Sequence, residues 1–243
     1  MFVLKTFNTL ASLAPKASTP LLIQSAGLKD FKPLKSYDGI EIPNKPKLRM
    51  MLKVPQYTNI RPPRMQKRLI LMRGPEVEHN TQLVHKQFGV IALMGGRIKY
   101  PHIEMVRLSI GRKMDTSRMF AVWRIPEPWQ PLHKKGVGVR LGGGKGSIDH
   151  YAIPIRAGRV ILEIGGDCEF DEVKSMLNHV AVNLPFKAMA VSQTMLDEIE
   201  QKKLTDKKRN LNPFTKQYVI QNNLNGCHKW LGKYDHHWFG EYL

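Results

Sequence analysis

The sequence predicts an α+β fold: a mostly antiparallel sheet with two packed helices, an extended basic N-terminal arm and an aromatic-rich C-terminal extension. Three observations predict it. In the middle of the chain, apolar residues switch between the alternation typical of strands and the spacing typical of helices. The segment before it is rich in proline and cations, and residues 210–243 carry seven aromatic residues. We therefore divide the chain into residues 1–29, 30–87, 88–191 and 192–243.

The first segment has the composition of a targeting sequence. Residues 1–29 contain three lysines and no acidic residue. From Phe2 to Leu13, apolar residues recur on one face of a potential helix. This pattern is typical of an amphipathic mitochondrial presequence, although the arginines usual in such segments are absent before Arg49.

The second segment predicts an extended arm. Residues 30–87 contain 12 basic and 5 acidic residues. Seven prolines between Pro33 and Pro75 prevent long helices and interrupt the hydrogen bonding of sheets. Arg61-Pro-Pro-Arg64 and Lys67-Arg68 favour an arm that lies on a polyanion, with a solvated linker as the alternative.

The central segment predicts alternating strands and helices. Residues 90–94 predict a short apolar strand. A helix follows over residues 102–113, where apolar side chains recur at helical spacing from Ile103 to Ile110. Residues 118–125 alternate between two faces, which predicts a second strand.

The rest of the central segment predicts a hairpin, a helix and a last strand. Residues 151–155 and 160–164 flank Arg156-Ala157-Gly158-Arg159, which predicts a β-hairpin. Residues 169–184 give the clearest helix, because six apolar residues share one face and acidic residues occupy the first turn. A proline ends that helix, and residues 186–191 predict the last strand.

The C-terminal extension begins as a polar helix from Met195 to about Leu204. After Asn210 the periodicity is lost, although aromatic residues continue. We expect that part to order on a partner, either protein or RNA.

Residues 134–146 form the most informative stretch, Lys-Lys-Gly-Val-Gly-Val-Arg-Leu-Gly-Gly-Gly-Lys-Gly. Six glycines and four cations occupy these thirteen positions without any carboxylate. Such a loop can approach a polyanion closely. It is not a nucleotide-binding P-loop, because Val139 stands where the first glycine is needed and Gly146 stands where a hydroxyl is needed.

The charge balance predicts a nucleic-acid partner. The chain of 243 residues has a net charge of +18 and 42% hydrophobic residues. Residues 97–145 alone hold 11 basic and 3 acidic residues. No run approaches the ~18 apolar residues of a membrane span. The two cysteines, Cys168 and Cys227, predict no disulfide framework.

Six short motifs follow one another through the central segment. They are Phe88-Gly89, Ile103-Glu104 with Arg107, Trp123-Arg124-Ile125-Pro126, Arg140-Leu141-Gly142 with Gly144-Lys145-Gly146, Gly158-Arg159-Val160 with Glu163-Ile164, and Leu184-Pro185-Phe186-Lys187.

With these motifs, residues 88–191 resemble the universal large-subunit ribosomal protein family sixteen, bacterial type. The resemblance implies an α+β protein that binds large-subunit ribosomal RNA near the peptidyl-transferase region and the elbow of the aminoacyl-site transfer RNA. The family's loop, Arg-Met-Gly-Lys-Gly-Lys-Gly, points toward that functional centre. Here Leu141 replaces the methionine and Gly143 replaces a lysine. The presequence-like start and both extensions suit a mitochondrial member, located in the matrix and surrounded by other mitochondrial ribosomal proteins.

Two alternatives belong to other functional classes. For an RNA-processing enzyme, His102-Ile103-Glu104 offers a deaminase-like H-x-E, but no P-C-x-x-C follows. Zinc at Cys227-His228 and His236-His237 matches no common finger spacing. For a membrane-surface protein, no basic helix beyond the N-terminus carries the required amphipathicity.

The sequence therefore predicts ribosomal RNA and aminoacyl-site transfer RNA as partners, with no catalytic residue, cofactor, metal or membrane span. The predicted contacts to ribosomal RNA are Arg97, Lys99, Arg107, Arg112, Lys113, Arg124, Lys134 and Lys135. The predicted functional-centre loop consists of Arg140, Gly142, Gly144, Lys145 and Gly146.

Overall fold

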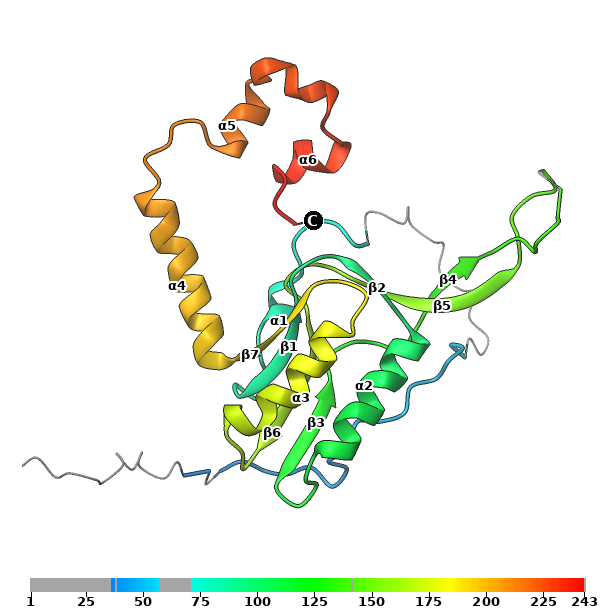
Figure 1. Cartoon of the computed structure of the whole chain (residues 1–243), viewed down its shortest axis with the longest axis vertical. Coiled ribbons are helices and arrows are strands. Elements are labelled where there is room, and N and C mark those ends of the chain that lie inside the picture. The colour runs from blue at the N-terminus through cyan, green and yellow to red at the C-terminus, as the bar shows by residue number, and fades with distance from the viewer. Residues whose placement is uncertain (1–35, 38, 57–70, 141, 243) are drawn as a thin grey trace, which may run out of the picture. The chain divides into compact units, whose positions relative to one another are not determined.

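The computed structural model describes residues 36–37, 39–56, 71–140 and 142–242 (Figure 1). The predicted presequence and the paired basic residues at 61–68 lie outside these ranges. The chain divides into two units, residues 1–36 and 37–243, and the second unit is the one described below.

The larger sheet has four strands in the order β3-β6-β1-β7. These strands are β3 (Met119–Trp123), β6 (Val160–Gly166), β1 (Phe88–Ala92) and β7 (Ala188–Ser192). All three pairings are antiparallel. Every residue of β6 is buried, which fits its central position between β3 and β1.

The smaller sheet has three antiparallel strands in the order β2-β5-β4. They are β2 (Gly96–Lys99), β5 (Ile148–Ile155) and β4 (Gln130–His133). Residues on one face, including Ile98 and Ile153, are buried in the main core.

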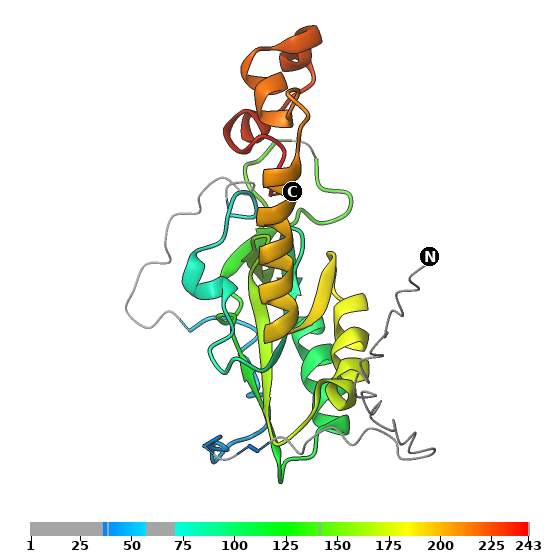
Figure 2. The ribbon, with the colours of Figure 1, turned by 90° about the vertical axis from the view of Figure 1, so that its left-hand side faces the viewer.

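Two helices complete the core. Helix α2 (Tyr100–Lys113) contacts α3 (Phe170–Val182), and α3 also contacts β1 and β7. Figures 1 and 2 show the two helices next to each other on one face of the larger sheet. The apolar face predicted for α2, from Ile103 to Ile110, is buried. The α+β prediction is therefore confirmed.

The β-hairpin predicted from the sequence is wrong. The segments 151–155 and 160–164 do not form a hairpin, because β5 and β6 belong to different sheets. A strand has two hydrogen-bonding edges. Those of β6 are occupied by β3 and β1, and those of β5 by β2 and β4. The turn between them instead bonds to β1, with Gly158 N donating to Ala92 O at 2.7 Å and Ala92 N donating to Arg159 O at 2.9 Å.

The described part of the N-terminal arm packs against the domain. Leu48 and Met51 are buried in the main core. The backbone N–H of Ala121 donates to Pro46 O at 2.8 Å, and the Trp123 indole donates to Arg49 O at 3.0 Å. These contacts place residues 46–51 beside β3. The short helix α1 (Glu78–Thr81) lies near the end of this arm, before β1.

The C-terminal extension is helical. It contains α4 (Gln193–Arg209), α5 (Lys216–Gln221), the 3₁₀ segment η1 (Leu224–Lys229) and α6 (Lys233–Trp238). Helix α4 is longer than predicted, and the loss of periodicity after Asn210 did not indicate the short elements. None of the described helices is long and apolar enough to cross a membrane.

Both ends of the extension contact the preceding part of the chain. Near its start, Leu196 packs against a small cluster that contains Leu83 and Val191. Near its end, the Trp238 indole lies over Gly74, where an added Cβ would come within 2.6 Å of the ring. The absence of a side chain at Gly74 therefore makes room for Trp238.

Candidate RNA interface

The glycine-rich loop connects β4 and β5, which form a hairpin through pairs from Gln130↔Ala152 to His133↔Ile148. Two hydrogen bonds close the loop at its base. Lys134 N donates to Ser147 O at 3.2 Å, and the His133 ring nitrogen Nδ1 lies 2.8 Å from Gly146 O. The backbones approach so closely there that a Cβ on Gly146 would lie 2.6 Å from Lys134 O. Glycine at 146 is therefore a steric requirement of the loop.

The conformation of the loop depends on its other glycines. Gly138, Gly142, Gly143 and Gly144 have φ values of +84°, +100°, +65° and +82°. Side chains other than glycine rarely adopt these values. An added Cβ at any of the four would meet no atom within 4 Å. Backbone conformation, rather than crowding, therefore explains the glycines at these positions.

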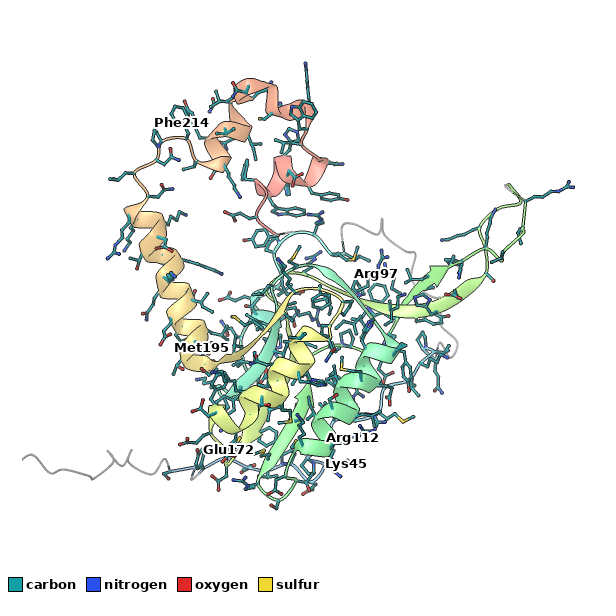
Figure 3. The ribbon with its side chains drawn as sticks, in the orientation of Figure 1. Lys45, Arg97, Arg112, Glu172, Met195 and Phe214 are labelled. Carbon is teal, nitrogen blue, oxygen red and sulfur yellow. The ribbon has the colours of Figure 1, made fainter. Side chains whose placement is uncertain are left out.

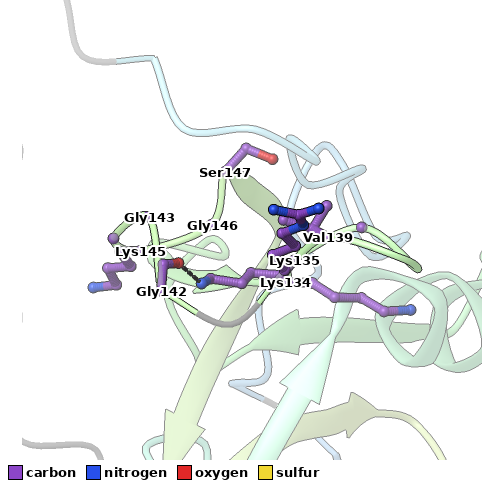
Figure 4. Close-up of a pocket in the computed structure, with 11 residues that line it drawn as sticks. Lys134, Lys135, Val139, Gly142, Gly143, Lys145, Gly146 and Ser147 are labelled. Atoms are coloured by element: carbon purple, nitrogen blue, oxygen red, sulfur yellow. Dashed lines mark hydrogen bonds between the residues drawn. The ribbon is translucent and has the colours of Figure 1, made fainter.

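The loop is open to a partner. Described residues from Lys134 to Lys145 are all exposed, and the Val137 side chain is fully exposed. Lys135 Nζ donates a hydrogen bond to Gly142 O across the loop (Figure 4). A cavity of about 400 Å³ lies inside, lined by the loop's glycine backbone and by Lys134, Lys135, Arg140 and Lys145. An exposed cationic loop of this kind is suited to a phosphate-rich partner.

Two more predicted contacts lie on the smaller sheet. Arg97 and Lys99 are two positions apart on β2, so they share a face of the sheet. Ile98 between them points to the core and is buried. Lys99 is exposed, and Arg97 is half-buried. The labelled Arg97 in Figure 3 lies on the same sheet as the hairpin that carries the loop.

The structure does not gather all the predicted cations together. Arg112 and Lys113 are exposed in the last turn of α2, whereas Lys99 immediately precedes the helix. Fourteen helical residues separate these ends, which corresponds to about 20 Å. Figure 3 shows Arg112 and Arg97 at opposite ends of α2. The predicted contacts therefore fall into at least two separate groups.

Two predicted contacts are paired with carboxylates of the protein itself. Arg107 binds Glu104 through two nitrogens, with Nη2 2.6 Å and Nε 3.1 Å from the carboxylate oxygens. Arg124 Nε lies 2.9 Å from Glu163 Oε1, and Arg124 Nη2 donates to His79 O at 3.0 Å. The Arg124 side chain is only 17% exposed. Because these ion pairs neutralise Arg107 and Arg124, both arginines attract phosphate less strongly than the exposed lysines do.

Glu163, the partner of Arg124, is the centre of a hydrogen-bonding network that the sequence did not predict. Glu163 is 1% exposed on the central strand. Besides Arg124, its two oxygens accept hydrogen bonds from Val84 N and His85 N, each at 3.0 Å. A buried carboxylate needs such partners. Glu163 thus joins β6, β3 and the segment before β1.

The residues that suggested a deaminase have structural roles. Lys99 N donates to His102 Nδ1 at 3.2 Å at the start of α2. Burial and the Lys99 charge both lower the pKa of His102. The hydrogen bond from Arg107 holds the pKa of Glu104 below its usual value. Glu104 is therefore an ionised partner of arginine. In the described ranges, no three His, Cys, Asp or Glu residues are arranged to hold a metal ion.

Two sequence comparisons relate the chain to known proteins. The sequence profile of the family "Ribosomal protein L16p/L10e" matches residues 59–191, more than half of the chain. The large ribosomal subunit protein uL16 of Psychrobacter cryohalolentis is 32% identical over 124 residues, which cover 48% of this chain and 88% of that protein. The chain therefore belongs to the ribosomal protein L16p/L10e family, as a non-enzymatic, structural and RNA-binding constituent of the large ribosomal subunit.

Proposed function

We propose that this chain is the mitochondrial member of its family. It acts in the matrix, among other mitochondrial ribosomal proteins, in the large subunit of the mitochondrial ribosome. The proposal is supported by residues 1–29, which contain three lysines and no acidic residue and have the amphipathic spacing of a presequence. It is also supported by residues 30–58 and 192–243, which extend the chain on both sides of the residues that the family profile matches.

Within the subunit, we place the chain near the peptidyl-transferase region and the elbow of the aminoacyl-site transfer RNA. The observation that carries this proposal is the loop at the end of the β4–β5 hairpin. It is exposed, cationic and free of carboxylates, and its shape depends on four glycines with positive φ. Such a loop can enter a narrow site between RNA segments, where a bulkier or acidic loop could not.

The proposed cationic contacts divide into two roles. Those on the smaller sheet, at the end of α2 and at the base of the loop bind ribosomal RNA phosphates and hold the protein in the subunit. Arg140, at the glycines, contributes a planar guanidinium that can bind RNA bidentately. The proposed phosphate contacts are Arg97, Lys99, Arg112, Lys113, Lys134 and Lys135, and the proposed functional-centre residues are Arg140, Gly142, Gly144, Lys145 and Gly146.

The test of the loop separates assembly from translation. Arg140→Ala removes one of 11 cations between residues 97 and 145. We therefore expect normal amounts of the large subunit but reduced peptide synthesis. Arg112→Ala is the matched control, because it also removes an exposed arginine, but in the last turn of α2 and not in the loop. Normal translation with Arg140→Ala would refute the functional role of the loop.

The test of the location uses the N-terminus. Import into isolated mitochondria should remove residues up to about 29, and N-terminal sequencing of the mature protein reads the new start. A mature protein that retains Met1 or Phe2 would contradict the presequence.

A further inference from the structure

The C-terminal extension contains a long stretch of uncompensated positive charge. Residues 207–234 include six lysines and arginines and no aspartate or glutamate. All six cations are exposed: Lys207, Lys208, Arg209, Lys216, Lys229 and Lys233. Acidic residues occur on both sides, at Asp206 and Asp235. The stretch therefore attracts a polyanion near both of its ends, at residues 207–216 and 229–233.

Aromatic rings in the same stretch face solvent. Trp230 is 85% exposed, Phe214 is 61% exposed and Tyr218 is 47% exposed. Phe214 and Tyr218 lie edge to face, with ring centroids 6.1 Å apart. Lys216 lies between these two in the sequence, and Lys229 precedes Trp230. Exposed rings thus alternate with cations. In Figure 3, the labelled Phe214 lies in the connection between α4 and α5.

The extension holds its shape without using these three rings as core. Thr215 Oγ1 accepts the Tyr218 N–H at 3.3 Å and begins α5. The His228 ring donates from Nε2 to Ile220 O at 2.6 Å, and the Cys227 thiol donates to Val219 O at 3.4 Å. Ile220 is the one buried residue of α5. The exposed rings are therefore presented by a backbone that other side chains fix.

We propose that residues 207–234 form a second RNA-binding surface that binds unpaired nucleotides. Bases stack on Trp230 and on the Phe214–Tyr218 pair, and the six cations contact phosphates. Aromatic rings interleaved with lysines are the chemistry of single-strand recognition, because every base has a face that can stack. A protein partner would have to supply acidic groups to match the cations, whereas RNA carries a phosphate beside every base.

This surface goes beyond the proposed function. It lies outside residues 59–191, to which the family profile applies, and it differs from the glycine-rich loop in its chemistry. The loop has cations and backbone but no ring, which suits close approach to phosphates. The extension offers rings, and it therefore selects unpaired over paired RNA.

The test compares two RNA probes on the full chain. Fluorescence anisotropy measures binding of a single-stranded RNA of about 12 nucleotides and of a duplex of the same length. Trp230→Ala should weaken binding of the single strand by about 5- to 150-fold, the range for loss of one stacked base. Binding of the duplex should not change. Trp230→Phe should retain most of the affinity, because it keeps a ring.

Two controls make the result decisive. Leu211 is 93% exposed in the same extension but has no ring, so Leu211→Ala should leave both affinities unchanged. The series is repeated in a chain with Lys134→Ala and Lys135→Ala, so that binding by the loop does not hide the extension. If these two lysine substitutions by themselves abolish duplex binding, that result concerns the glycine-rich loop and not the extension. Unchanged single-strand binding with Trp230→Ala in both backgrounds would overturn the proposal. If incorporation into the subunit were nevertheless lost, the surface would instead be identified as a protein contact.

Discussion

Replacing Arg124 tests whether this arginine serves the fold or the RNA. The change Arg124→Ala leaves Glu163, which is 1% exposed, without its cationic partner at 2.9 Å. Removing one partner of a buried ion pair costs about 3–5 kcal/mol. Two backbone N–H donors, from Val84 and His85, remain on the carboxylate. We therefore expect the free energy of unfolding to fall by about 3 kcal/mol, the lower end of this range.

Urea denaturation of the full chain, followed by circular dichroism, measures this loss as a fall in the free energy of unfolding. The same loss should lower the melting temperature by roughly 6–12 °C, at about 2–4 °C per kcal/mol for a chain of this size. Adding Glu163→Gln to Arg124→Ala removes the uncompensated charge, but it turns the amide NH2 toward the backbone N–H of Val84 or His85. The double variant should therefore recover only part of the lost free energy of unfolding. Arg112→Ala, which removes an exposed arginine, should change stability by less than about 0.5 kcal/mol.

In ribosomal RNA binding, Arg112→Ala should have a larger effect than Arg124→Ala, the opposite of their effects on stability. If Arg124 acts through Glu163, the salt dependence of ribosomal RNA binding should be the same with Arg124→Ala as with the original chain. Arg112→Ala should instead reduce the log–log slope by about 0.7–0.9, which corresponds to one lost phosphate contact. A destabilisation under about 1 kcal/mol with Arg124→Ala, together with a reduced slope, would refute the structural role of this residue.

Three further predictions follow from the loop and the cysteines. Replacing both Lys134 and Lys135 by Ala should reduce the salt slope of ribosomal RNA binding by about 1.4–1.8 without loss of stability, and an unchanged slope would mean that both face solvent in the subunit. Gly144→Val should impair peptide synthesis, because φ at this position is +82°. Gly144→Asn should impair it less, because asparagine tolerates such φ values. Equal activity of the two variants in a translation assay would contradict this backbone explanation. Burial raises the pKa of Cys168 to about 11. At pH 8.5, iodoacetamide should therefore modify the partly exposed Cys227 first. Equal modification rates at the two cysteines of the folded protein would be inconsistent with the burial of Cys168.

The elements that the sequence predicted well are those whose signal is local. The helix around Ile103 and Ile110 and the helix around Val173 both bury the face that their spacing indicated. The exposed cationic loop was also predictable, because it consists of adjacent residues. These features depend on neighbours within about two turns of chain.

The features that escaped prediction depend on distant residues. Strands β2 and β4 have four residues each, too few for a pattern to stand out. The false hairpin arose because sequence adjacency says nothing about which edge of β6 is already occupied. The role of Glu163 depends on hydrogen bonds to residues 78 and 79 positions away. The arm was predicted to be extended, but the burial of Leu48 and Met51 had no local signal.

The contact between Gly74 and Trp238 has a thermodynamic consequence for the extension. The start of α4 and the end of α6 are both held by residues that precede the extension. The residues between these two contacts therefore form a tethered arch, and the entropic cost of closing this loop is met when the protein folds. A ligand that binds the arch meets a preorganised surface. Binding therefore costs less conformational entropy than it would with an untethered extension. Gly74→Leu, which has no room beneath the indole, should therefore untether the arch at one end. It should weaken ligand binding to the arch even though it changes no residue that touches the ligand.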